Sequence, residues 1–325
     1  MDRTLSLITT TGRLTLGNPL GALRRFVGAQ DAASSPYDCF FGLADLHALT
    51  TPQDPAVLRA TVTEMATLFL AAGLDPERAT LFRQSRVPAH RELAYLLECT
   101  AYTGELNRMI QFKEKGRGVP STRVSLYTYP TLMAADILLY RPAAVPVGDD
   151  QRQHVELTRD LAIRFNHTYG PVFVVPEVTV PAAGARVMDL QDPTSKMSKS
   201  AAADAGVIRL LDPPDVVRRK VARAVTDSDT GPDAVRVSRD DKPGVTNLLD
   251  LLAACGGSAQ GISTYGALKA AVTDAVVAVL EPLQKSYAEL GDDPGYVESV
   301  FDAGSTRARE VTASVLADAT AAMGL

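Results

Sequence analysis

Two hydrophobic periodicities alternate along the N-terminal part of the chain, and this alternation constrains the fold more than any other feature of the sequence. Short β-forming runs at residues 4–9, 39–44 and 81–85 indicate strands. Longer amphipathic stretches at residues 20–27 and 55–72 have helical spacing. Strands that alternate with helices pair most economically in a parallel sheet. We therefore predict an α/β fold built on a parallel sheet.

The C-terminal third of the chain has a different composition. Asp212-Pro213-Pro214 and Asp241-Lys242-Pro243 each indicate the start of a helix, and from residue 265 onwards the chain is Ala-rich and Val-rich helix. A chain of 325 residues can bury one large core and a smaller second one. We expect two domains, residues 1–190 and residues 191–325, the second of them helical.

Apolar runs and cysteine spacing indicate an intracellular protein. No stretch approaches the roughly 18 uncharged apolar residues that a membrane-spanning helix needs, and the N-terminus lacks the order of a secretion signal. Cys39, Cys99 and Cys255 lie far apart, without the spacing of a zinc site or a disulfide framework. We predict a soluble, cytoplasmic protein with buried thiols and no protein-bound metal.

The net charge of −5 argues against a protein that coats nucleic acid, because such domains are usually basic. A partner that is gripped locally remains compatible with this charge. Basic residues cluster at Arg24-Arg25 and at Arg218-Arg219-Lys220 with Arg223. Each cluster is either a nucleic-acid contact or, as is more common on helices, a solvated face.

Residues 194–200, which we call the lysine loop, carry two lysines between Pro193 and a run of small residues. Two long ammonium side chains on a mobile loop can neutralise the charge that develops as a phosphate bond breaks. A bare Lys-x-x-Lys is usually solvated surface, but the full Lys196-Met197-Ser198-Lys199-Ser200 rarely occurs by chance. The two lysines could therefore act on a polyphosphate, and the alternative is a solvated surface loop.

A second phosphate-binding corner follows the first strand. Thr10-Thr11-Gly12 indicates a turn, and Asn18-Pro19 indicates a helix start, with the Asn side chain capping free N–H groups. A strand, a glycine turn and a helix N-terminus together form a geometry that attracts phosphate. The alternative is that Asn18 only caps the helix.

The segment from Tyr129 to Tyr140 places a carboxylate in apolar surroundings. On a helix Tyr129, Met133, Asp136 and Tyr140 share one face. A buried carboxylate is costly unless it accepts hydrogen bonds, so Asp136 needs a dedicated donor. That donor is either internal to the protein or a ligand N–H, and an indole, with one donor on a flat apolar ring, would fit.

Two further polar segments follow expected strands. His47 comes after the strand at residues 39–44, at the edge where open α/β sheets bind ligands, although a hydrogen-bonded structural role is the common alternative. Gly148-Asp149-Asp150-Gln151 turns into a helix, where the acids could simply be caps.

Together these motifs resemble those of the class I aminoacyl-tRNA synthetases, and in particular the bacterial tryptophanyl-tRNA synthetases. The lysine loop matches their signature loop, and Thr11-Gly12 with Gly17-Asn18 match their Thr-Gly-x-x-x-x-Gly-Asn pattern. The stretch at residues 129–140 is close to their indole-recognising helix, and Gly148-Asp149-Asp150-Gln151 resembles their Gly-Glu-Asp-Gln. The likeness spans essentially the whole chain.

The resemblance implies a Rossmann-like catalytic domain with a helical dimerisation insertion at about 86–140, followed by a helical anticodon-binding domain. It implies ATP with Mg²⁺, the substrates L-tryptophan and tRNA(Trp), and a homodimer. Tryptophan would attack the α-phosphate of ATP, and a tRNA ribose hydroxyl would then take the acyl group. Neither step needs a protein nucleophile, so catalysis would rest on positioning and charge stabilisation.

The resemblance also assigns site residues. Catalytic roles fall to Lys196, Lys199 and Lys115. Tryptophan binding falls to Asp136, Met133, Tyr129, His47 and Gln151. ATP binding falls to Thr9, Thr10, Thr11, Gly17, Asn18, Gly148, Asp149, Asp150, Val187, Lys196, Met197, Ser198, Lys199 and Ser200.

Departures from the family pattern lie next to this site. Where family members usually have Gly-x-Gln-Pro-Ser-Gly, residues 7–12 read Leu-Ile-Thr-Thr-Thr-Gly. We expect an active enzyme with altered substrate or inhibitor affinity, as in an auxiliary copy. The alternatives are a paralogue that activates tryptophan or an indole acid for another acceptor, a non-catalytic tryptophan or nucleotide sensor, and a tyrosine-specific relative.

Overall fold

The computed structural model describes residues 3–116, 118–146, 148, 151–179, 187–199 and 204–325. Its first part alternates strands and helices, as the sequence predicts. The elements are β1 (Thr4–Thr9), η1 (Asn18–Leu23), α1 (Arg24–Ala32), β2 (Cys39–Ala44), α2 (Asp45–Ala48), α3 (Pro55–Ala71), β3 (Thr80–Arg83) and η2 (Gln84–Arg86).

The remaining elements are mostly helical. They are α4 (Ala89–Glu98), α5 (Thr103–Leu106), α6 (Ile110–Lys115), α7 (Val124–Leu138), β4 (Ala144–Pro146), α8 (Arg152–Tyr169), β5 (Glu177–Thr179), η4 (Asp204–Gly206), α9 (Pro214–Ala222), α10 (Pro243–Ala254), α11 (Tyr265–Gly291) and α12 (Pro294–Ala322). None of the described helices is long and apolar enough to cross a membrane.

The described strands form two parallel sheets. The first has the order β1-β2-β3, in which Thr4 pairs with Cys39 and Phe40 with Thr80. The second consists of β4 and β5, and β4 lies beside β1. The central strand β2 is buried along its whole length because helices cover both faces. The predicted Rossmann-like α/β fold is confirmed.

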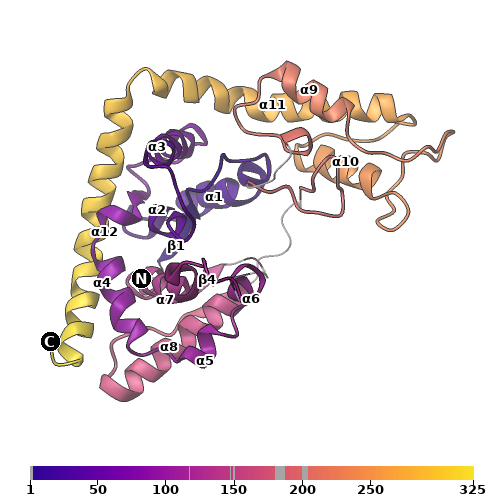
Figure 1. Ribbon diagram of the computed structural model, residues 1–325. Coiled ribbons are helices and arrows are strands. Elements are labelled where there is room, and N and C mark those ends of the chain that lie inside the picture. Colours follow the sequence, from indigo (N-terminus) through magenta and orange to yellow (C-terminus); the bar gives the residue numbers. More distant parts are fainter. Residues whose placement is uncertain (1–2, 117, 147, 149–150, 180–186, 200–203) are drawn as a thin grey trace.

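The last two helices, α11 and α12, pack against the strand-containing half of the molecule. Figure 1 shows α11 passing over the top of the molecule and α12 descending along its side, past α3 and α4. The fit of α12 against β3 is close, because a Cβ atom on Gly304 would lie 1.8 Å from the carbonyl oxygen of Leu81. Arg83 and Arg86 then form ion pairs with Glu298 of α12.

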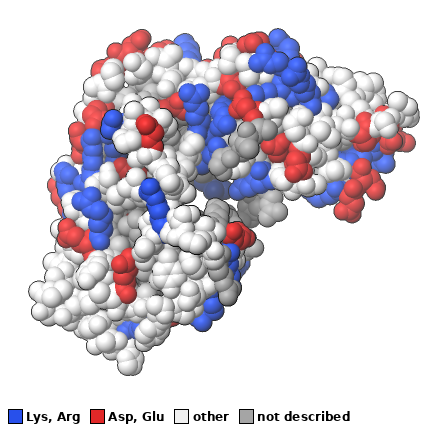
Figure 2. Space-filling view, in the orientation of Figure 1, with Lys and Arg blue, Asp and Glu red and all other residues white. Residues whose placement is uncertain are grey.

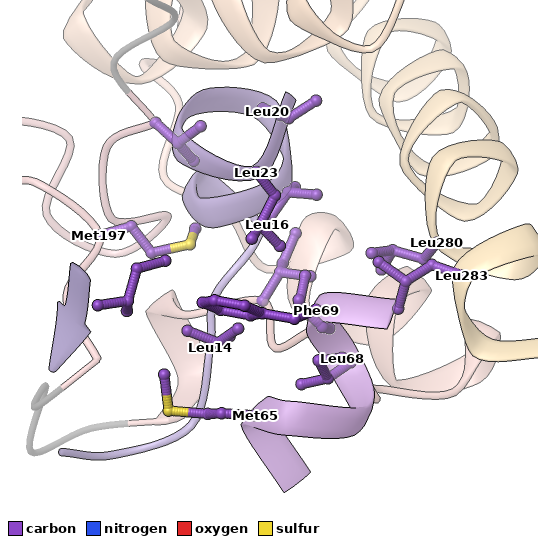
Figure 3. Close-up of a cluster of buried hydrophobic side chains, with 14 of the residues drawn as sticks. Leu14, Leu16, Leu20, Leu23, Met65, Leu68, Phe69, Met197, Leu280 and Leu283 are labelled. Carbon is purple, nitrogen blue, oxygen red and sulfur yellow. The ribbon is translucent and has the colours of Figure 1, made fainter. Parts of the chain in front are cut away.

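One hydrophobic cluster joins the sheet, the lysine loop and the C-terminal helices. Leu14, Leu16 and Phe69 pack with Leu280 of α11, and Met197 of the lysine loop enters the same cluster with 4% exposure (Figure 3). The loop therefore has an apolar anchor between its two lysines. The division into domains at residue 190 stays a prediction. The C-terminal helix α12 packs on strand β3 of the first sheet.

Four local expectations differ from the structure. The third strand ends at Arg83, and residues 84–86 form the turn η2 instead. Asn18 does not cap, because it lies inside the first turn of η1, and its Oδ1 accepts a 2.9 Å hydrogen bond from the Thr15 amide. Cys99 is exposed, since it ends the amphipathic helix α4. Lys220 is 7% exposed because it bonds Asp212 and Asp204, so it is not part of a solvated basic face.

Candidate active site

A cavity of about 480 Å³ opens between the two sheets, near the carboxyl ends of β1 and β2. Its wall combines side chains from β1, α2, α7 and the turn before α8. Five of the predicted tryptophan-binding residues line it, namely His47, Tyr129, Met133, Asp136 and Gln151, together with Gly148 and Thr9 from the predicted nucleotide site. Parallel sheets bind ligands at this edge where neighbouring strands diverge.

Asp136 is 3% exposed and receives three side-chain donors. Gln84 Nε2 lies 2.7 Å from Oδ1 and 2.9 Å from Oδ2, His90 Nδ1 lies 2.6 Å from Oδ1, and His47 Nε2 lies 2.8 Å from Oδ2. Burial would raise the pKa of this carboxyl, but the hydrogen bonds from His47 and His90 outweigh it and hold the pKa at about 2. Asp136 is therefore ionised and acts only as an acceptor.

The tautomer of His90 follows from its two partners. Its Nδ1 faces the ionised Asp136 and must carry a proton, while its Nε2 lies 3.0 Å from the Tyr140 hydroxyl. Burial raises the pKa of Tyr140 well above its ordinary value, so the hydroxyl keeps its proton and donates it to Nε2. A chain of hydrogen bonds thus runs from Tyr140 through His90 to Asp136.

Tyr129 also lines the cavity, with its ring 6.1 Å from that of His47. Its hydroxyl is hydrogen-bonded to Nε2 of His154, which lies on α8. Burial raises the pKa of Tyr129 well above its ordinary value, so the phenol stays neutral. Tyr129 therefore offers the cavity a neutral aromatic ring whose hydroxyl has a fixed partner.

The lysine loop meets the end of β1 at Lys199. The Nζ atom of this residue donates a 2.8 Å hydrogen bond to the carbonyl oxygen of Thr9, and burial lowers the pKa of the amine to about 8. A Cβ atom on Gly12 would lie 2.6 Å from the carbonyl oxygen of Lys199, and Gly12 has φ +67°. Glycine is therefore required for this approach. Lys196 and Ser198 are exposed.

A short antiparallel bridge positions the start of the loop. Met188 pairs with Lys196, and the amide of Met197 donates to the carbonyl oxygen of Val187 at 3.0 Å. Val187 is buried, and a Cβ atom on Gly17 would lie 3.8 Å from its Cβ. The glycine corner, Val187 and the lysine loop thus converge beside the cavity.

The threonines that replace the usual family residues have separate environments. Thr9 lines the cavity. Thr10 is 1% exposed, and within the described residues its buried hydroxyl has no hydrogen-bond partner. Thr11 is partly exposed. A buried hydroxyl without a partner loses hydrogen-bond energy, so Thr10 has an unused donor and acceptor at the end of β1.

Some predicted residues cannot be placed. Asp149, Asp150 and Ser200 lie outside the described residues, as does the side chain of Lys115. The Asn18 side-chain oxygen points back to Thr15 and not into the cavity wall. The Met197 side chain is in the core, which leaves only its backbone for a ligand.

Sequence reasoning missed Gln84 and His90, which are both fully buried partners of Asp136. A usable signal was present for Gln84. It follows the third strand in the same way as His47 follows the second, and carboxyl ends of parallel strands meet at one edge. His90 lies on α4, where sequence alone favours an ordinary buried position.

Comparisons with known proteins identify the family. A family model described as tRNA synthetases class I (W and Y) matches residues 3–288. A tryptophan–tRNA ligase 1 from Streptomyces avermitilis is 53% identical over 335 residues, covering 100% of this chain and 99% of that protein. The chain belongs to the class I tRNA synthetases of the tryptophan and tyrosine group.

Solved structures give the same result. Tryptophanyl-tRNA synthetase from Mycoplasma pneumoniae superposes with a TM-score of 0.89 at 36% identity, covering 100% of this chain and 98% of that one. The Campylobacter jejuni enzyme, complexed with ADP and tryptophan, superposes with a TM-score of 0.84 at 29% identity, covering 99% and 100%. The Streptomyces relative and these two structures are all named as tryptophan enzymes.

Proposed function

We propose that this chain is a tryptophan–tRNA ligase, which activates L-tryptophan with ATP and transfers it to tRNA(Trp). The single observation that carries the assignment is the 53% identity to a tryptophan–tRNA ligase along essentially the full length of both chains. The alternatives of a non-tRNA acceptor, a sensor or a tyrosine-specific enzyme are not favoured by these relatives.

The cavity is proposed to hold tryptophan. Its volume of about 480 Å³ suits an amino acid with a bicyclic ring, and Met133 and Tyr129 supply apolar wall. Asp136 is the only acidic side chain among the described residues that line it. We assign the indole N–H to Asp136, the ring to Met133 and His47, and the amino group to Tyr129 and Gln151.

The nucleotide is proposed to lie against the glycine corner and under the lysine loop. Gly17 and Val187 would face the adenosine, and the orphaned hydroxyl of Thr10 would gain a partner from it. Lys196 and Lys199 would neutralise the phosphates, with Lys115, Asp149 and Asp150 as further predicted contacts. Thr9, Thr11, Asn18, Gly148, Ser198 and Ser200 complete the proposed set.

The chemistry then needs no covalent enzyme intermediate. A carboxylate oxygen of tryptophan attacks the α-phosphorus, the bond to the bridging oxygen breaks, and pyrophosphate leaves. A ribose hydroxyl of the tRNA next attacks the acyl carbon, the bond from that carbon to the phosphate oxygen breaks, and AMP leaves with the hydroxyl proton on its phosphate. The lysines stabilise the charge on the leaving pyrophosphate, which is the main demand of phosphoryl chemistry.

Mg²⁺ is proposed to arrive with the nucleotide. Within the described ranges, no three His, Cys, Asp or Glu side chains are grouped as metal ligands. Mg²⁺ commonly keeps its waters and binds through substrate phosphates, so the described residues fit it only as a partner of ATP.

Exposed apolar side chains support the proposed homodimer. Tyr95, Tyr102 and Val124 lie within the predicted dimerisation insertion, and they are 65%, 62% and 75% exposed. Contact with a second copy would cover them. Val124→Glu should shift the protein toward monomer in sedimentation, whereas Val57→Glu on α3, where the valine is 61% exposed, should not. If both variants remained dimers, the interface would have to lie on another surface.

The helical C-terminal region is proposed to hold the anticodon end of the tRNA. Figure 2 shows Lys and Arg side chains gathered over α9 at the edge of the molecule, and Arg218, Arg219 and Arg223 lie there. Phosphate contacts from such side chains position a nucleic acid. A cytoplasmic location accords with this role.

The assignment is tested by ATP–pyrophosphate exchange with each amino acid, followed by charging of tRNA(Trp). Tryptophan alone should support exchange, and the product should be tryptophanyl-tRNA. Exchange without charging would favour the non-tRNA acceptor, and exchange with tyrosine would favour the tyrosine-specific reading. No exchange with any amino acid would contradict the proposal.

A further inference from the structure

The Asp136 carboxylate is already surrounded by three side-chain donors. An ionised carboxylate offers about four lone-pair positions. Gln84 Nε2 lies between the two oxygens, at 2.7 and 2.9 Å, while His90 Nδ1 bonds Oδ1 and His47 Nε2 bonds Oδ2, so three donors share these positions. Because Asp136 is 3% exposed, an indole N–H that reaches it from the cavity, as the proposed function requires, has to compete with a donor already in place.

The three donors differ in how easily they can leave. Gln84 and His90 are fully buried, and each is held at its other end. Gln84 Oε1 accepts from the Leu46 amide at 3.1 Å, and His90 Nε2 pairs with Tyr140. The His47 side chain is 13% exposed and lines the cavity. His47 borders the cavity and is partly exposed, so it can turn away from Asp136 without leaving a buried polar atom unpaired, whereas the other two cannot.

We propose that His47 is an exchangeable donor that determines how strongly the site selects for a ring N–H. In this structure His47 occupies Oδ2 of Asp136, and tryptophan, on binding, replaces it with the indole N–H. This proposal rests on the cavity being the tryptophan site. The preference for a ligand with an indole N–H then equals the difference in free energy between two similar hydrogen bonds to Asp136, one from the indole and one from His47. His47 therefore keeps this preference small.

The proposal predicts how analogues bind. L-3-benzothienylalanine has sulfur in place of the indole N–H, so it leaves His47 on Asp136. Removing the His47 donor abolishes the competition, and only tryptophan gains. A hydrogen bond to a charged group corresponds to roughly tenfold or more in affinity. A residue that merely lines the wall would change both affinities in proportion.

The test is the ratio of the two dissociation constants, measured by calorimetry. In His47→Leu the preference for tryptophan over the sulfur analogue should rise about tenfold or more. In His47→Gln, which keeps a donor at a similar reach, it should stay within about threefold of the wild type. An unchanged or smaller ratio in His47→Leu would overturn the exchange.

A second measurement uses the wild-type protein and needs a variant only to assign one resonance. In ¹⁵N-histidine spectra of the wild-type protein, tryptophan should shift the His47 Nε2 resonance away from its carboxylate-bonded position, and the sulfur analogue should not. The His47→Gln spectrum identifies the resonance. Equal shifts with both ligands would overturn the proposal. If the wild type binds neither ligand, the proposed tryptophan site itself fails, which is a distinct result.

Discussion

The Nζ atom of Lys199 lies 2.8 Å from the carbonyl oxygen of Thr9, a residue that also lines the cavity. One residue of β1 therefore contacts both the proposed amino-acid site and an ammonium of the lysine loop. The Lys199 side chain is partly buried at this contact, and the burial lowers the pKa of its amine. Movement of the loop onto a nucleotide would have to break this hydrogen bond.

Activity should depend on the protonation of Lys199. Burial lowers its pKa to about 8, so the amine is charged below that pH and neutral above it. Only the charged form neutralises phosphate. The value of kcat/KM for ATP in the exchange reaction should therefore fall as the pH rises through about 8. Lys199→Arg stays charged, so its kcat/KM should not fall over this pH range. The same fall in that variant would show that another group causes it.

Gly12 should be required for the contact between β1 and the lysine loop. Gly12→Ala would put a Cβ atom 2.6 Å from the Lys199 carbonyl oxygen at φ +67°. Gly261→Ala is the matched control, because Gly261 has φ +79° and nothing within 4 Å. Both variants should lose about 1 kcal/mol of stability from backbone strain. Only Gly12→Ala should also lower exchange activity, and equal activities would contradict the close approach.

The Asp136 network should contribute strongly to stability. Asp136→Asn places an amide donor among the side chains of Gln84, His90 and His47, which already donate. The mismatch should cost about 3 kcal/mol in urea unfolding. Asp215→Asn, at an acid 71% exposed on α9, should cost less than about 1 kcal/mol. Equal midpoints for the two variants would argue against the network.

Gly304 should be essential for docking α12 against β3. Gly304→Ala would place a Cβ atom 1.8 Å from the Leu81 carbonyl oxygen, and neither backbone can yield without separating the helix from the strand. Gly291→Ala, with nothing within 4 Å on α11, is the control. The melting temperature should fall by several degrees or more in the first variant and stay within about 2 °C in the second.

The periodic parts of the fold could be predicted from sequence because burial imposes them locally. Strand β2 is continuous and apolar. Asp54 caps α3, because its side chain accepts hydrogen bonds from the amides of Ala56 and Val57. The direction of a single side chain could not be predicted. Asn18 has the chemistry of a cap, but the π-helix η1 starts at Asn18 itself, one residue earlier than predicted. Its side-chain oxygen therefore accepts from the Thr15 amide.

The parts of the site that follow from helical spacing could be predicted from the sequence. The spacing of Tyr129, Met133 and Asp136 placed them on one face, and all three line the cavity. The need for a donor to Asp136 was also predictable, but the donors Gln84 and His90 come from a turn and a helix 52 and 46 residues away in sequence. Such long-range pairs follow from tertiary packing, which periodicity does not encode.

The central claim is that the lysine loop and the cavity serve one reaction, in which Lys199 acts on phosphate and not on tryptophan. The most direct test compares Lys199→Ala with Lys285→Ala, an exposed lysine on α11, by tryptophan-dependent ATP–pyrophosphate exchange and by tryptophan binding. We predict that Lys199→Ala lowers the exchange rate about 100-fold, with tryptophan affinity within about threefold, and that Lys285→Ala changes neither. Exchange at the wild-type rate in Lys199→Ala would contradict the account.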